Sequence, residues 1–241
     1  MSDVVIIFML CIAGGIIQRT SGFGFGVFIM TMLPFLTPSY GEATALSGLL
    51  AMSSSLIVVV KMYKYIRWKR IMPVLITFAA VSAICVSVLR HLDDEAIRRI
   101  LGVVLIVTSL YFIFFSERIR KPSTLPFKIG TGAVAGVLGG FFGMQGPPAV
   151  IYFLNSEQDK QHYMAMSQCF FLVGNACMSI FRAANGFVTK AVLGDFAYGI
   201  WGVVVGTAIG ALIYKHLPTR ILSYIIYIYI GISGVILLVT V

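Results

Sequence analysis

Long apolar stretches separated by short charged clusters dominate this sequence. A helix needs about 20 apolar residues to cross the hydrocarbon core of a bilayer. Only 11% of the 241 residues are charged, whereas soluble domains carry about 25%. The chain therefore predicts an all-α polytopic membrane protein. Six stretches predict full membrane-spanning helices: residues 42–60, 71–89, 97–115, 163–181, 191–213 and 221–241.

Two further apolar segments, residues 4–36 and 127–154, are interrupted near their middles by glycine and proline. Glycine permits backbone conformations that other residues resist, and proline disrupts the interior of a helix. Each segment therefore predicts two half-length helices around an irregular joint. Either a broken helix that crosses the membrane or a re-entrant hairpin satisfies this pattern.

The formal net charge of +9 indicates topology rather than a nucleic-acid partner, because the basic residues lie in short clusters between apolar spans. Basic loops favour the cytoplasmic side. We therefore expect the loop at residues 61–70 and the linker at 117–126 to be cytoplasmic. The loop at 90–99, which also carries three acidic residues, is expected outside.

The two halves of the chain have the same order of elements, a broken segment followed by three spans. A shift of 121 residues places Gly15 on Gly136, Gly22 on Gly143 and Ser47 on Gln168. We expect a first repeat at residues 1–116, the linker at 117–126 and a second repeat at 127–241. Hairpin joints would make the repeats inverted and single crossings would make them parallel. Inverted repeats with broken helices are common in secondary transporters, and we favour them.

Both joints are expected to bind an anion near the midplane. Helix N-termini carry free N–H groups and partial positive charge, and Arg19 is the one formal charge near the middle of its segment. A charge at that depth is unfavourable unless it is paired or hydrated. Arg19 either holds an anionic substrate with its guanidinium fork or serves as a structural strut. The other predicted binding residues offer backbone or neutral polar groups: Gln18, Thr20, Ser21, Gly22, Gly24, Gly143, Gln145 and Gly146.

The spans that follow the joints add two further sets of candidates. Ser47, Ser54, Gln168 and Asn175 are expected either to line the same cavity or to form hydrogen bonds between helices. Proton coupling would require a titratable group near the site. Glu42, His162 and Asp195 are candidates, although all three lie near span ends, where interfacial charges are common.

No cofactor or metal site is expected from this sequence. Its four cysteines lie inside apolar stretches and form no CxxC or Cys/His cluster, so we expect them to pack as small apolar residues. An intramembrane hydrolase is a remote alternative. A nucleophilic serine such as Ser21 needs a base within reach, and the histidines fall in predicted loops or at a span edge.

The doubled glycine-rich segments resemble those of the TauE/SafE family of anion transporters and sulfite exporters. The matching residues are Gly15, Gly22–Gly26 and Pro34 in the first half, and Gly136, Gly143–Gly146 and Pro147 in the second. The sequence departs from the family pattern at residues 145–148, where Gln-Gly-Pro-Pro replaces a run of glycines.

The resemblance implies a multi-pass protein of the cytoplasmic (inner) membrane that transports sulfite, sulfonates or related small organic anions. We expect a secondary transporter that acts as an exporter, coupled to H+ or Na+ and able to form homo-oligomers. A passive anion channel built from the same arginine and helix ends is the alternative.

Overall fold

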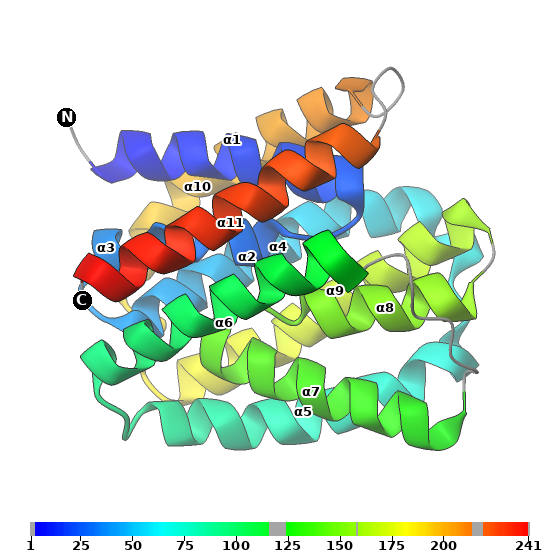
Figure 1. Cartoon of the computed structure of the whole chain (residues 1–241), viewed down its shortest axis with the longest axis horizontal. Coiled ribbons are helices and arrows are strands. Elements are labelled where there is room, and N and C mark those ends of the chain that lie inside the picture. The colour runs from blue at the N-terminus through cyan, green and yellow to red at the C-terminus, as the bar shows by residue number, and fades with distance from the viewer. Residues whose placement is uncertain (1–2, 116–123, 158, 214–218, 241) are drawn as a thin grey trace.

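The computed structural model describes residues 3–115, 124–157, 159–213 and 219–240. These residues form a bundle of helices (Figure 1). The first half of the chain contains α1 (Asp3–Ser21), α2 (Phe25–Ile29), α3 (Leu33–Leu36), α4 (Tyr40–Met62), the 3-10 turn η1 (Tyr63–Tyr65), α5 (Trp68–Leu89) and α6 (Asp94–Phe115). The second half contains α7 (Leu125–Phe142), α8 (Gly146–Ser156), α9 (Lys160–Ala184), α10 (Lys190–Ile213) and α11 (Thr219–Thr240).

The predicted all-α architecture is confirmed, whereas the bounds of the individual spans stay predictions. Seven of the described helices are long and apolar enough to cross a membrane, namely α1, α4, α5, α6, α7, α9 and α10. Large apolar side chains such as Ile84, Val107 and Trp201 are exposed on the outside of the bundle. Because such side chains are stable against hydrocarbon, these surfaces suit contact with lipid.

The first broken segment divides unequally, in contrast to the two half-length helices expected from its sequence. Helix α1 continues for 19 residues, and only the short helices α2 and α3 follow it. Gly22 (φ 86°) follows the last residue of α1, and Gly24 (φ 99°) precedes the first residue of α2, both in left-handed conformations. Helix α3 ends at Leu36, and Pro38 follows it closely.

Helix α1 packs along α10 in the same direction. Backbone atoms of Phe8, Ile12 and Ile16 lie beside Gly202, Gly206 and Gly210 in turn. Small residues spaced four apart allow membrane helices to approach closely. Helices α5 and α7 form a second pair of this kind, in which Gly132, Gly136 and Gly140 face α5. The other extensive pairs are α4 with α9 and α6 with α11.

Each broken segment returns to the end of the bundle at which it began. We call the end that carries Arg67, Arg70 and Glu157 the basic end. Helix α7 begins there, alongside the start of α5, and α8 ends there, where Glu157 pairs with both arginines. Helix α1 begins at the opposite end, in register with α10, and Figure 1 shows α1 and α7 starting at opposite ends.

By order along the chain, α1 in the first half corresponds to α7 in the second, and α5 corresponds to α10. The pair α1 with α10 therefore has its counterpart in the pair α7 with α5. The repeat boundaries and the inverted relationship themselves stay predictions. Residues 117–123 of the predicted linker lie outside the described residues.

The glycine contacts between α1 and α10 predict a sharp sensitivity to added volume. A Cβ placed on Gly206 would lie 2.2 Å from the carbonyl oxygen of Ile12. We expect Gly206→Ala to separate the helices and destabilise the protein by about 1–3 kcal/mol, as overpacking does. The measurement is the melting temperature of the detergent-purified variant.

Gly194→Ala is the matched control on the same helix, because no atom lies within 4 Å of a Cβ at Gly194. Equal melting temperatures for the two variants would contradict the close packing of α1 against α10.

Candidate functional site

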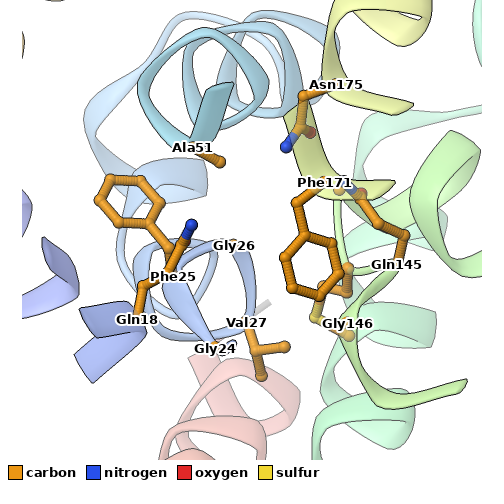
Figure 2. Close-up of a pocket in the computed structure, with 12 residues that line it drawn as sticks. Gln18, Gly24, Phe25, Gly26, Val27, Ala51, Gln145, Gly146, Phe171 and Asn175 are labelled. Carbon is orange, nitrogen blue, oxygen red and sulfur yellow. The ribbon is translucent and has the colours of Figure 1, made fainter. Parts of the chain in front are cut away.

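A small cavity lies where the two joints meet. Its volume is about 20 Å³, which is room for about one water molecule. Gln18 and Phe25 stand on one side and Gln145 and Phe171 on the other, with Asn175 above them in the view (Figure 2). Its full lining consists of Gln18, Gly24, Phe25, Gly26, Val27, Ala51, Gly143, Met144, Gln145, Gly146, Phe171 and Asn175.

Glycine conformations create both joints. At the first joint, Gly22 closes α1 through its N–H, which donates to the carbonyl of Gln18 at 2.9 Å. At the second, Gly143 has a φ of 67° and donates to the carbonyl of Gly139 at 2.9 Å. Left-handed glycine is a common C-cap because it lacks a Cβ. The chain then reverses into α8, whose Pro147 and Pro148 occupy its first turn.

The backbones of the two joints touch directly. A Cβ placed on Gly26 would lie only 2.4 Å from the carbonyl oxygen of Gly143. The hydroxyl of Ser47 lies beside both glycines, and it has no hydrogen-bond partner among the described residues. Any side chain at Gly26 would therefore push the joints apart and change the cavity wall.

Three amide side chains supply the polar lining of the cavity: Gln18 from α1, Gln145 from the second joint and Asn175 from α9. The Nε2 of Gln18 donates to Ser55 Oγ and to Gln168 Oε1, both at 2.9 Å. Gln145 differs, because its Oε1 is buried without a hydrogen-bond partner in the described structure. Buried polar groups are normally satisfied, so this oxygen can still accept a hydrogen bond from a donor in the cavity.

Gln168 does not line the cavity but holds the first joint in place. Its Nε2 donates to the carbonyl of Gly22 at 2.7 Å, while its Oε1 accepts from Gln18. Ser54 likewise connects helices, with its hydroxyl 3.5 Å from that of Thr207. Four polar residues of the spans were candidates for the cavity lining. Of these, Asn175 is in the lining, and Ser47 lies beside the lining residues Gly26 and Gly143.

Arg19 is not part of the described cavity wall. Its side chain is half-buried, and its Cβ packs against Gly210 of α10. The hydroxyls of Thr20 and Ser21 are used locally, since Thr20 donates to the carbonyl of Ile16 at 2.8 Å and Ser21 to that of Ile17 at 2.7 Å. The structure thus brings together Gln18, Gly24, Gly143, Gln145 and Gly146 but not these three side chains.

The three candidates for proton coupling lie apart from the cavity. Glu42 is in the first turn of α4, and Asp195 is in the first half of α10. His162 is at the basic end, where its Nδ1 is 2.9 Å from Asp159 Oδ2. None of the three contributes to the described cavity lining.

The sequence analysis missed Arg182, a fully buried arginine in α9. Its Nη2 donates to the carbonyl of Gly139 at 2.8 Å, at the end of α7, and its Nε and Nη1 have no described partner. The predicted span ended at residue 181, so Arg182 fell one position outside it. Because α9 continues to Ala184, this guanidinium is held inside the bundle.

Arg182 shares a face of α9 with the cavity. Asn175 precedes it by seven residues, which is two helical turns, or about 10 Å. Both Asn175 Oδ1 and Arg182 Nη1 lie near Gly48 of α4. No carboxylate forms an ion pair with Arg182 among the described residues. Its charge therefore reaches the cavity through a poorly screening interior.

No group of three or more His, Cys, Asp or Glu side chains suitable for a metal occurs in the part of the chain that the structure describes.

Comparison with known proteins identifies the family. The family described as sulfite exporter TauE/SafE matches residues 6–237, nearly the whole chain. This chain belongs to that family. Because TauE/SafE is a family of membrane transporters, the protein is a multi-pass membrane transporter and not an enzyme.

A curated relative supports the same assignment. The chain is 24% identical over 208 residues to a protein of Cupriavidus necator named "Probable sulfite/organosulfonate exporter TauE". The match covers 82% of this chain and 79% of the relative. No solved structure matches the chain.

The contact between the joints yields a second prediction. We expect Gly26→Ala to reduce anion transport at least about tenfold, an effect of about 1.4 kcal/mol, because its Cβ would displace the carbonyl of Gly143. The rate of anion efflux from proteoliposomes measures the effect.

Gly130→Ala is the control, because a Cβ at Gly130 meets no atom within 4 Å. Normal efflux by Gly26→Ala would show that the contact is not needed for transport.

Proposed function

We propose that this TauE/SafE transporter exports small sulfur-containing or organic anions, such as sulfite or sulfonates. The anion occupies the cavity between the joints, near the midplane. The observation that carries the proposal is a buried cavity lined by three amides, within two helical turns of a buried guanidinium. The printed name of the Cupriavidus necator relative supports the substrate class.

The amide groups match the chemistry of an oxyanion. The NH2 groups of Gln145 and Asn175 can donate to an anion, whereas that of Gln18 already donates to Ser55 and Gln168. Hydrogen bonds to a charged oxygen are stronger than those between neutral groups. Arg182 supplies positive charge without closing the site, since only its Nη2 is used by backbone carbonyls. A sulfonate or sulfite ion presents several oxygens that the amides can share.

The cavity volume favours a carrier over a passive channel. A cavity of about 20 Å³ is smaller than an ion of four or more heavy atoms, because it holds about one water. Binding therefore requires the two joints to separate, and such a motion is what alternating access uses. Coupling to H+ or Na+, homo-oligomers and the cytoplasmic membrane stay predictions.

Proteoliposomes test the proposed function directly. Vesicles loaded with radiolabelled sulfite should release it faster when unlabelled sulfite is present outside, because a carrier returns faster when loaded. The panel should also include sulfate, thiosulfate, taurine, sulfoacetate, acetate, lactate and chloride.

Asn175→Ala should lower the affinity for the preferred anion about tenfold by removing one charge-assisted hydrogen bond. Release that is unaffected by external anion would indicate a channel, and no release of any anion would overturn the proposal.

The two intramembrane arginines give a further prediction. We expect Arg182→Lys to weaken anion binding, because lysine keeps the charge but loses the planar fork that holds Gly139. If Arg19 contacts substrate, Arg19→Ala should abolish binding while the protein still folds, and Arg19→Lys should restore it only in part. Anion-dependent thermal stabilisation of the purified variants measures both effects.

Ser87→Ala is a suitable control, since this exposed hydroxyl bonds only to its own helix at Ala83. Wild-type stabilisation in Arg19→Ala would make Arg19 a structural strut. Wild-type stabilisation in Arg182→Lys would remove Arg182 from the site.

A further inference from the structure

A second, larger cleft opens at the basic end of the bundle. Its volume is about 430 Å³, and it is lined by Arg67, Arg70, Ser156, Glu157, Asp159 and His162. Arg67 immediately precedes α5 and Arg70 lies in its first turn, whereas the other residues come from the end of α8 and the start of α9. The two halves of the chain therefore meet at this cleft.

Glu157 joins the two sides of the cleft through ion pairs with both arginines. Its Oε2 accepts from Arg67 Nη1 at 3.1 Å and its Oε1 from Arg70 Nη1 at 2.9 Å. The Glu157 side chain is 1% exposed, whereas the arginine side chains are 45% and 46% exposed. A buried carboxylate is thus covered by two guanidinium groups that also face the cleft.

The arginines can bind more than this one carboxylate. A guanidinium group carries five N–H donors. The contacts described for the two side chains use Nη1 alone, on Glu157 and, for Arg70, also on the carbonyl of Ser156 at 3.1 Å. Arginine pairs are well matched to planar or tetrahedral oxyanions. The cleft has room for such an ion beside both side chains.

The remaining acidic group in the cleft is already engaged. Asp159 caps α9 by accepting from the N–H groups of Gln161 and His162, both at 3.1 Å. The hydrogen bond from the His162 side chain lowers the pKa of Asp159. Glu157 is therefore the carboxylate that occupies the arginines.

Helix α8 links this cleft to the cavity between the joints. Gly146 at its first residue lines the cavity, and Glu157 follows its last residue. Its 11 residues span about 16 Å at 1.5 Å per residue. Release of Glu157 would free the end of α8 that lies farthest from the cavity.

We propose that this cleft is the entry site for the transported anion, at which the anion competes with Glu157 for Arg67 and Arg70. While Glu157 holds both arginines, α8 is fixed to the start of α5 and the cavity is closed toward the basic end. An incoming sulfonate or sulfite binds both arginines in place of Glu157, and α8 then moves to open a path from the cleft to the cavity. This inference rests on the proposed function for the identity of the anion.

The test combines two measurements on Glu157→Gln, which keeps the side-chain shape but removes the charge. The first is the labelling rate of Ala51→Cys, a cavity residue, by a charged methanethiosulfonate added at the basic end without any anion. The four native cysteines are replaced by alanine for this purpose. We expect Glu157→Gln to raise the rate about tenfold, because breaking a buried ion pair favours the open state.

The second measurement is the Kd for ethanesulfonate by calorimetry. We expect Glu157→Gln to bind about threefold to tenfold more tightly than wild type, because an internal competitor reduces apparent affinity. The double variant Arg67→Gln/Arg70→Gln should bind more weakly. Glu157→Asp keeps the charge on a shorter side chain and should fall between wild type and Glu157→Gln.

Glu95→Gln is the matched control, because Glu95 pairs with Arg99 on an exposed helix surface. A labelling rate for Glu157→Gln equal to that of Glu95→Gln would overturn the closure by Glu157. Faster labelling with an unchanged Kd would overturn the competition with the anion. Faster labelling in a protein that transports no anion would refute the proposed function while retaining the closure.

Discussion

The direct contact of backbone with backbone is the constraint on which this structure depends. Gly26 lies against the carbonyl of Gly143 where the joints meet, and Gly206 lies against the carbonyl of Ile12 where α1 meets α10. In a bilayer, helices gain little from burying apolar side chains, because lipid is equally apolar. Close approach through glycine provides dispersion contacts instead, and it places two interrupted segments side by side.

The helix interruptions at the two joints are tolerated because backbone carbonyls that lack a helical partner accept hydrogen bonds from side chains of the protein. Irregular backbone inside a membrane is stable only where protein or a cavity satisfies it. Gln168 donates to the carbonyl of Gly22 at the first joint, and Arg182 donates to the carbonyl of Gly139 at the second. Both side chains come from α9. This helix therefore supports both joints and also contributes Asn175 to the cavity between them.

The two polar sites of the molecule differ in how their charges are used. Around the inner cavity, three neutral amides supply the polar part of the wall and Arg182 contributes its charge from two helical turns away. At the basic end, two arginines are already neutralised by Glu157. The proposed transport cycle uses this difference, since an anion replaces a carboxylate at the entry and then moves to a site without one.

Apolar length and glycine placement determined much of the fold from the sequence alone. The runs of apolar residues predicted the helices, and the glycine clusters at residues 22–26 and 143–146 predicted both joints, because these features act locally. The direction of each broken segment was open in the sequence. It was decided by contacts such as those of Glu157 with Arg67, which join residues 90 positions apart.

The tertiary structure alone separated the two intramembrane arginines. Arg19 stood out in the sequence because its segment is otherwise apolar, yet its Cβ packs against α10 and it does not line the cavity. Arg182 fell one position beyond a predicted span, and it is buried because α4 and α7 pack against it. Sequence reports which residues are costly to bury, whereas the packing of distant helices decides which of them is buried and what it faces.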